Sequence, residues 1–62
     1  MENIETICKL LEGLSRKYPD MRFGQLVTNV SYWANGPTSS AAWDVTDEDW
    51  IAAAKGNLEK NN

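Results

Sequence analysis

A polar stripe in the middle of the chain has residue types suited to binding a ligand. Arg22, Gln25 and Asn29 are three and four residues apart, a spacing that places side chains on one face of a helix. The guanidinium offers only hydrogen-bond donors, whereas each carboxamide offers both donors and an acceptor. Two aromatic residues, Tyr32 and Trp33, follow at the end of the stripe, and their rings suit stacking on a flat ligand. The stripe therefore predicts a compact surface for hydrogen bonding and stacking.

Arg22 is the most informative residue of this stripe because it falls in the first turn of the predicted helix. The helix dipole is positive there and disfavours a cation by about 0.3 to 1 kcal/mol. The arginine therefore needs an anion, which is Asp20, a carboxylate of the preceding helix, a partner chain or a ligand. One interpretation is an internal salt bridge with an ordinary solvated face, and the other is a binding site.

The same residues carry a resemblance. Residues 18–29 contain Pro19-Asp20-Met21-Arg22-Phe23-Gly24-Gln25-Leu26, with Asn29 after them. This run resembles the P-D-x-R-F-G-Q element, followed by Leu or Ile, of small uncharacterised phage and bacterial helical proteins. Those proteins place it between two helices and follow it with an acidic, aromatic segment, which residues 43–50 match in layout. The resemblance implies a phage or mobile-element setting but no particular biochemical activity.

The chain lacks the two residue types that most often serve as general base and as paired zinc ligands, apart from one cysteine. The chain has no histidine and a single cysteine, Cys8, so it has neither an imidazole base nor the ligands of a conventional zinc site. Cys8 lies on a predicted apolar face and is expected to be a small buried hydrophobe. The acidic run at Asp47, Glu48 and Asp49 is explained by helix initiation. We therefore predict no enzymatic activity, no catalytic residue, no metal site and no cofactor.

The elements that position the stripe are helices. Hydrophobic periodicity predicts an all-α fold of three short helices, over about 3–18, 21–35 and 47–58. Expected N-caps are Asn3, Asp20 and Thr46, the last with Asp49 as its capping-box partner. Gly36, in a left-handed conformation and followed by Pro37, is expected to end the second helix, and residues 36–42 are expected to form a loop. Gly56 and Asn57 are candidates for an early end of the third helix.

Helix-surface pairs and close contacts are also predicted. Glu5–Lys9 and Glu12–Arg16 have the spacing and order of favourable pairs on a helix surface. Gly13, in the middle of the first helix, indicates close contact with another helix.

The three tryptophans are predicted to have different environments. Val45 and Trp50 occupy the hydrophobic-staple positions around Thr46, which places Trp50 in the core. Trp33 lies on the border of the apolar face of the second helix. Trp43, in the predicted loop, is the one expected outside the core and joins Tyr32 and Trp33 as a candidate for stacking.

Composition limits the partners. The 62 residues form one predicted domain, 1–62, with six basic and nine acidic residues and a net charge of −3. A domain of about 60 residues buries only about 60% of its unfolded surface, so we expect completion by self-association into a homo-oligomer. The acidic balance disfavours long nucleic acids. No run is long and apolar enough for a membrane span, and residues 1–5 lack the basic stretch and long apolar run expected of a signal peptide. A cytoplasmic protein is expected, in the host cell if it is phage-encoded.

Two functional hypotheses remain. In the first, a pocket around the second helix sequesters a small anionic ligand such as a signalling nucleotide, possibly to evade host defence. Arg22 would meet phosphate, Gln25 and Asn29 would contact base edges or ribose, and Tyr32, Trp33 or Trp43 would stack on the base. In the second, an aromatic surface covers and blocks a host or phage protein.

Overall fold

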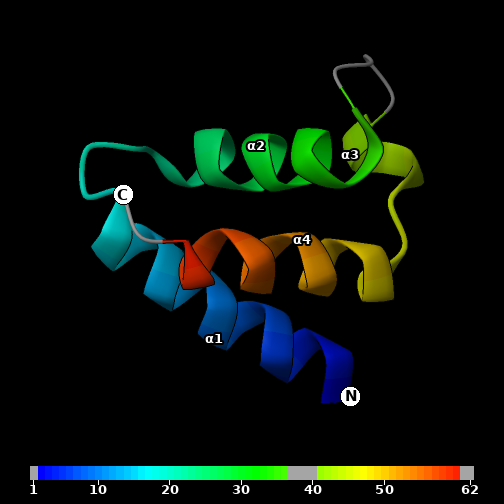
Figure 1. Ribbon diagram of the computed structural model, residues 1–62, viewed down its shortest axis with the longest axis horizontal. Coiled ribbons are helices and arrows are strands. Elements are labelled where there is room, and N and C mark those ends of the chain that lie inside the picture. The colour runs from blue at the N-terminus through cyan, green and yellow to red at the C-terminus, as the bar shows by residue number, and fades with distance from the viewer. Residues whose placement is uncertain (1, 37–40, 61–62) are drawn as a thin grey trace.

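The structure is a computed structural model that describes residues 2–36 and 41–60. These residues contain four helices (Figure 1). Helix α1 spans Glu2–Lys17, α2 spans Phe23–Asn35, α3 spans Ala41–Asp44 and α4 spans Asp47–Glu59. The predicted all-α class is confirmed, and the three longer helices lie within two residues of their predicted bounds. No helix within these ranges is both long and apolar enough to cross a bilayer.

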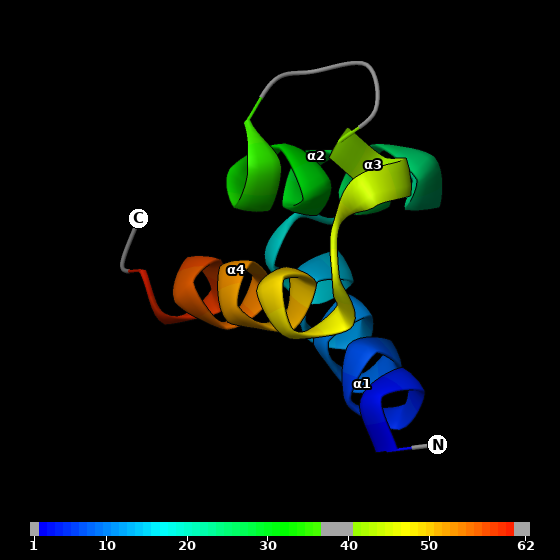
Figure 2. The same ribbon diagram turned by 90° about the vertical axis from the view of Figure 1, so that its right-hand side faces the viewer.

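The three longer helices surround a common interior. Helices α2 and α4 run in opposite directions beside each other, and α1 packs against both of them (Figure 1). The short helix α3 packs on α2, as the turned view in Figure 2 shows. One face of α2 therefore lies against α1 and α4, and α3 covers part of another. The remaining surface of α2 faces outward.

A small set of apolar side chains from the three longer helices forms the core: Leu14, Leu26, Val30, Trp50 and Ala54. Trp50 is only 6% exposed and follows directly after the capped start of α4. There the Thr46 Oγ1 accepts a hydrogen bond from the Asp49 backbone N–H at 3.1 Å, and Val45 packs against the core. The predicted cap and the predicted core position of Trp50 are both confirmed.

Helices α1 and α4 approach closely at Gly13. A Cβ atom at this position would lie 3.4 Å from Leu58 Cδ1 on α4, which is ordinary van der Waals contact. The predicted helix contact at this glycine is therefore confirmed. Gly56, by contrast, lies inside α4, which continues to Glu59, so the predicted early end of the helix is wrong.

The end of α1 is held against the end of α4 by polar contacts. Lys17 Nζ donates hydrogen bonds to the backbone carbonyls of Asn57 and Lys60, and Tyr18 Oη donates to Asn57 Oδ1 at 2.7 Å. A cation beside the last carbonyls of a helix satisfies them and complements the negative end of its dipole. These contacts therefore stabilise the start of the turn that leads from α1 to α2.

The start of α2 differs from the prediction. The helix begins at Phe23 rather than Met21, and Arg22 rather than Asp20 occupies the N-cap position. Two hydrogen bonds explain the later start. The Met21 N–H donates to the Tyr18 carbonyl at 3.1 Å, which continues the preceding turn, and the Gln25 side chain accepts from the Arg22 N–H at 2.9 Å. The side chain of Gln25 thus performs half of a capping box.

Residues 36–42 are not all loop, because α3 begins at Ala41. Residues 37–40 of the predicted loop lie outside the described residues. Gly36 ends α2 as predicted and has a positive φ of 85°, but its ψ of 173° differs from that of the expected left-handed helical conformation. Its N–H donates to the Tyr32 carbonyl at 2.7 Å.

Two predictions for α1 are wrong. Cys8 is exposed, because it lies about 120° around the helix from the buried Leu14 and outside the contacts with α2 and α4. Asn3 belongs to the first turn of the helix rather than to the cap, and its Nδ2 donates to Glu48 Oε2 of α4 at 3.2 Å. A contact of this kind, between a side chain and a neighbouring helix, depends on the tertiary structure. Local sequence patterns therefore do not predict it.

Candidate functional site

An open groove follows the first half of α2 and the residues just before it. It is lined by Met21, Arg22, Gly24, Gln25, Thr28 and Asn29 and has a volume of about 600 Å³. We call it the polar groove. The three polar residues of the predicted stripe, Arg22, Gln25 and Asn29, are all among its lining residues. Helical spacing alone brings them together, because they project from successive turns of one element.

Arg22 lies at the end of the groove where α2 begins. Its backbone is extended, with φ −80° and ψ 159°, and its side chain makes no capping hydrogen bond. Three features make this a cationic surface. The guanidinium is exposed, the first turn of α2 contains no acidic residue, and within residues 2–36 and 41–60 no carboxylate lies within 4.0 Å of the guanidinium.

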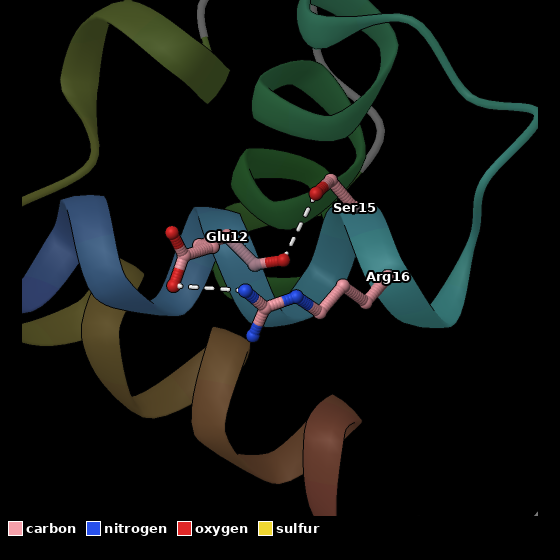
Figure 3. Close-up of polar contacts among 3 residues, drawn as sticks. All are labelled: Glu12, Ser15 and Arg16. Carbon is pink, nitrogen blue, oxygen red and sulfur yellow. Dashed lines mark hydrogen bonds and ion pairs between the residues drawn. The ribbon is translucent and has the colours of Figure 1, made fainter.

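The other arginine provides a direct contrast. Arg16 Nη2 lies 3.5 Å from Glu12 Oε1, one turn earlier on α1, beside a hydrogen bond from Ser15 Oγ to the Glu12 carbonyl (Figure 3). The predicted Glu12–Arg16 pair is therefore confirmed. The predicted Glu5–Lys9 ion pair is not formed within the described ranges. Arg16 has a carboxylate partner in the fold, whereas Arg22 has none among the described carboxylates.

The backbone at the start of α2 adds further donors to the groove. The first helical hydrogen bond is donated by Leu26 to the Arg22 carbonyl at 3.0 Å. The preceding N–H groups of Phe23, Gly24 and Gln25 therefore have no carbonyl within the helix to bind. A Cβ at Gly24 would have no neighbour within 4 Å, so the surface beside this residue is open. A helix start with exposed N–H groups and a positive dipole favours an anion.

The two carboxamides are partly used by the fold. Gln25 Oε1 accepts from the Arg22 N–H, which leaves the Nε2 group as a donor to the groove. Asn29 Nδ2 lies 3.4 Å from Met21 Sδ, which is a weak acceptor. The Asn29 Oδ1 is therefore the stronger hydrogen-bonding group that this side chain offers to the groove. The sequence interpretation missed Thr28, whose position three residues after Gln25 would have placed it on this face.

The aromatic residues of the predicted site do not line the polar groove. Tyr32 is exposed on α2 without lining the groove. Trp33 lines a different cavity of about 330 Å³ against α4, with Ala52, Ala53, Gly56, Asn57 and Lys60. Trp43 lies on α3 and is 91% exposed, which confirms that it lies outside the core. The predicted stacking surface is therefore not assembled beside Arg22 within one chain.

The acidic run belongs to the start of α4 rather than to a separate site. Asp47, Glu48 and Asp49 occupy the first turn of that helix, where carboxylates complement the dipole. Across residues 2–36 and 41–60, no three carboxylate or cysteine side chains gather as a metal ion would require.

Comparison of the chain with protein-family models, with curated proteins and with solved structures finds no significant match. The fold and the groove define a small all-α protein that presents one arginine and two carboxamides in an open groove along the start of α2.

Proposed function

We propose that this protein is a non-catalytic binding protein that sequesters a small anionic ligand in the polar groove, with a signalling nucleotide as the expected class. One observation carries the proposal. Arg22 is an exposed cation at the positive end of α2, and no described carboxylate pairs with it. A phosphate group would complement both the guanidinium and the dipole.

The arrangement of donors supports a ligand with several acceptor oxygens, such as a phosphorylated one, over a simple halide. Arginine binds phosphate through a planar fork of N–H groups, and the first N–H groups of α2 provide further donors beside it. The carboxamides of Gln25 and Asn29 lie one and two turns farther along the groove. Side-chain amides pair with the edges of bases and with ribose hydroxyls, so the groove suits phosphate at one end and a nucleoside at the other.

The size of the groove is compatible with this class, because ligand pockets typically measure about 300 to 1,000 Å³. Its lining, however, comes from one continuous segment, Met21 to Asn29, so much of a bound ligand would remain in contact with water. We propose that a second chain covers the ligand and supplies the stacking ring, drawn from Tyr32, Trp33 or Trp43. The phage setting and the evasion of host defence rest on the resemblance of residues 18–29 alone.

Calorimetric titration tests the proposal with a panel of inorganic phosphate, pyrophosphate, linear nucleotides and cyclic nucleotides. We expect micromolar binding of at least one nucleotide, weakened at least about tenfold in Arg22→Gln. Arg16→Gln is the matched control, because it removes the arginine that already pairs with Glu12. Recovery of chemically unchanged nucleotide by mass spectrometry would support binding without catalysis. Equal affinity of Arg22→Gln and the unmodified protein, or no binding across the panel at submillimolar ligand, would refute the proposal.

A second candidate function is favoured by the exposure of Trp43. An indole that is 91% exposed on a short helix is the type of residue that anchors protein–protein interfaces. In this alternative the protein blocks a host or phage protein through its aromatic surface. Trp43→Ser should weaken binding of such a partner and Arg22→Gln should leave it unchanged, whereas nucleotide binding should be weakened by Arg22→Gln.

A further inference from the structure

Two hollows that share no lining residue with the polar groove meet at the start of α4. The first, which we call the apolar groove, has a volume of about 300 Å³ and is lined mainly by Ile7, Leu11, Phe23, Val27, Val45 and Trp50. The second, which we call the acidic hollow, has a volume of about 290 Å³ and is lined by Glu2, Asn3, Ile4 and Asp47. Asp47 lines both hollows, so an apolar surface and an acidic surface adjoin there.

The apolar groove leaves hydrocarbon and aromatic surface in contact with water. Phe23 lines it and is nevertheless 69% exposed. Ile4, which is 47% exposed, precedes Ile7 by three residues and therefore lies on the same side of α1. An apolar hollow that is edged by exposed apolar side chains and bounded by polar residues is typical of an interaction surface.

The first turns of α1 and α4 lie at the same end of the protein (Figure 1). Asn3 Nδ2 donates a hydrogen bond to Glu48 Oε2 at 3.2 Å. At the other end, Lys17 of α1 contacts the last carbonyls of α4, so the two helices run in the same direction. Their first turns bring five exposed carboxylates to this end: Glu2, Glu5, Asp47, Glu48 and Asp49.

These carboxylates carry more negative charge than the helix dipoles compensate. The start of a helix is equivalent to about half a positive charge, so the two starts together supply about one positive charge against five negative ones. In the described part of the chain, no lysine or arginine nitrogen lies within 4.0 Å of any of the five. Neither hollow has a basic lining residue. The surface beside the apolar groove is therefore negative and open to a cationic partner.

We infer that the apolar groove and the acidic hollow together bind a basic amphipathic segment of another protein. Such a segment places apolar side chains in the groove beside Phe23 and lysine or arginine side chains over Glu2 and Asp47. Charge complementarity selects this occupant. A second copy of the chain, with its net charge of −3, would bring like charges together at this end, and an acidic segment would do the same.

The size of the groove agrees with a peptide as the occupant. Its volume is at the lower limit of small-molecule pockets, which is about 300 Å³, and it suits one or two side chains of a helix that docks through its apolar face. The inference does not depend on the nucleotide proposal, because Arg22 lines neither hollow. It also concerns a different surface from Trp43, which lines neither hollow as well.

Fluorescence anisotropy tests this inference with the full chain and labelled synthetic peptides of about 14 residues, or about four helical turns. In each peptide, lysine fills one helical face, and leucine, isoleucine, phenylalanine or tryptophan fills the other. We expect saturable, micromolar binding of at least one peptide. The same peptide with glutamate in place of every lysine should bind at least about tenfold more weakly.

Charge variants separate a local site from the general attraction of a cation to an acidic protein. Glu2→Gln combined with Asp47→Asn should weaken the best peptide at least about threefold at low salt, because two exposed ion pairs are lost. Asp20→Asn combined with Glu59→Gln is the matched control. It removes the same net charge just after α1 and at the end of α4, and it should change the affinity less.

Aromatic variants test the apolar groove. Phe23→Ser should weaken the best peptide at least about tenfold, because the groove loses its most exposed aromatic side chain. Tyr32→Ser is the control, since Tyr32 is an exposed aromatic residue of α2 that lines neither hollow. Circular dichroism checks the helix content of every variant. The inference would be overturned by a lack of saturable binding across the panel at submillimolar peptide, by equal binding of the lysine and glutamate peptides, or by equal losses in the two double variants.

Discussion

Replacing Arg22 by serine should make the protein more stable while removing its proposed anion site. Arg22 occupies the N-cap of α2 with an extended backbone and no capping hydrogen bond from its side chain. A serine hydroxyl at this position can accept from the N–H of Gln25, whose side chain already accepts from the N-cap N–H. Arg22→Ser would thus complete the capping box.

The expected gain has two parts. A good N-cap contributes about 1 kcal/mol, and removal of a cation from the positive end of the helix contributes about 0.3 to 1 kcal/mol at low salt. The sum is about 1 to 2 kcal/mol of unfolding free energy. For a chain of this size each kcal/mol raises the melting temperature by about 4 to 8 °C. The rise should therefore be easy to measure.

Thermal and urea unfolding followed by circular dichroism would measure this gain at low and high salt. The charge contribution should shrink as salt is added, whereas the capping contribution should persist. Arg16→Ser is the control and should act in the opposite direction, because it removes a favourable pair with Glu12 and a cation near the C-terminal end of α1. A loss of stability in Arg22→Ser would show that Arg22 has a stabilising partner within its own fold, and the reasoning would be refuted.

Three further predictions concern the scaffold. Gly56→Ala should stabilise the protein by about 0.5 to 1 kcal/mol in urea unfolding, because the added Cβ meets no atom within 4 Å inside a helix; a loss of stability would contradict an open helical environment at this position. Trp50→Ala should cost about 3 to 5 kcal/mol and abolish cooperative melting, whereas Trp43→Ala should change monomer stability by less than about 0.5 kcal/mol; similar losses at both positions would place Trp43 in the core. Tyr18→Phe should lower the unfolding free energy by about 1 kcal/mol through loss of the hydrogen bond to Asn57, and an unchanged urea midpoint would show that this bond contributes nothing.

Local features of the fold were predictable because local physical chemistry determines them. The three longer helices follow from apolar spacing. The cap at Thr46 depends on residues three positions apart and needs no knowledge of the rest of the chain. The gathering of Arg22, Gln25 and Asn29 in one groove is of the same kind, since helical geometry alone places them on neighbouring turns.

Features that depend on distant segments were not predictable from these patterns. Asp20 is a good N-cap by residue type, yet the turn through Tyr18 and Met21 shifts the helix start by two residues. The direction of Trp33 depends on α4, which covers one side of α2 and forms a separate cavity with the indole. Cys8 is exposed for a related reason, since only the packing of α2 and α4 decides which part of the apolar stripe of α1 becomes buried.

The energetic cost of Arg22 is itself an argument about function. The core of a domain of this size rarely contributes more than about 3 to 5 kcal/mol of stability, and only five apolar residues of the described ranges are buried in the core cluster. A cap that lowers stability by about 1 to 2 kcal/mol is therefore a large fraction of the total. Serine, threonine, asparagine or aspartate would avoid this cost at the same position. The cost of an exposed guanidinium at this cap supports the proposed anion site, because a guanidinium is suited to binding an anion and the usual capping residues are not.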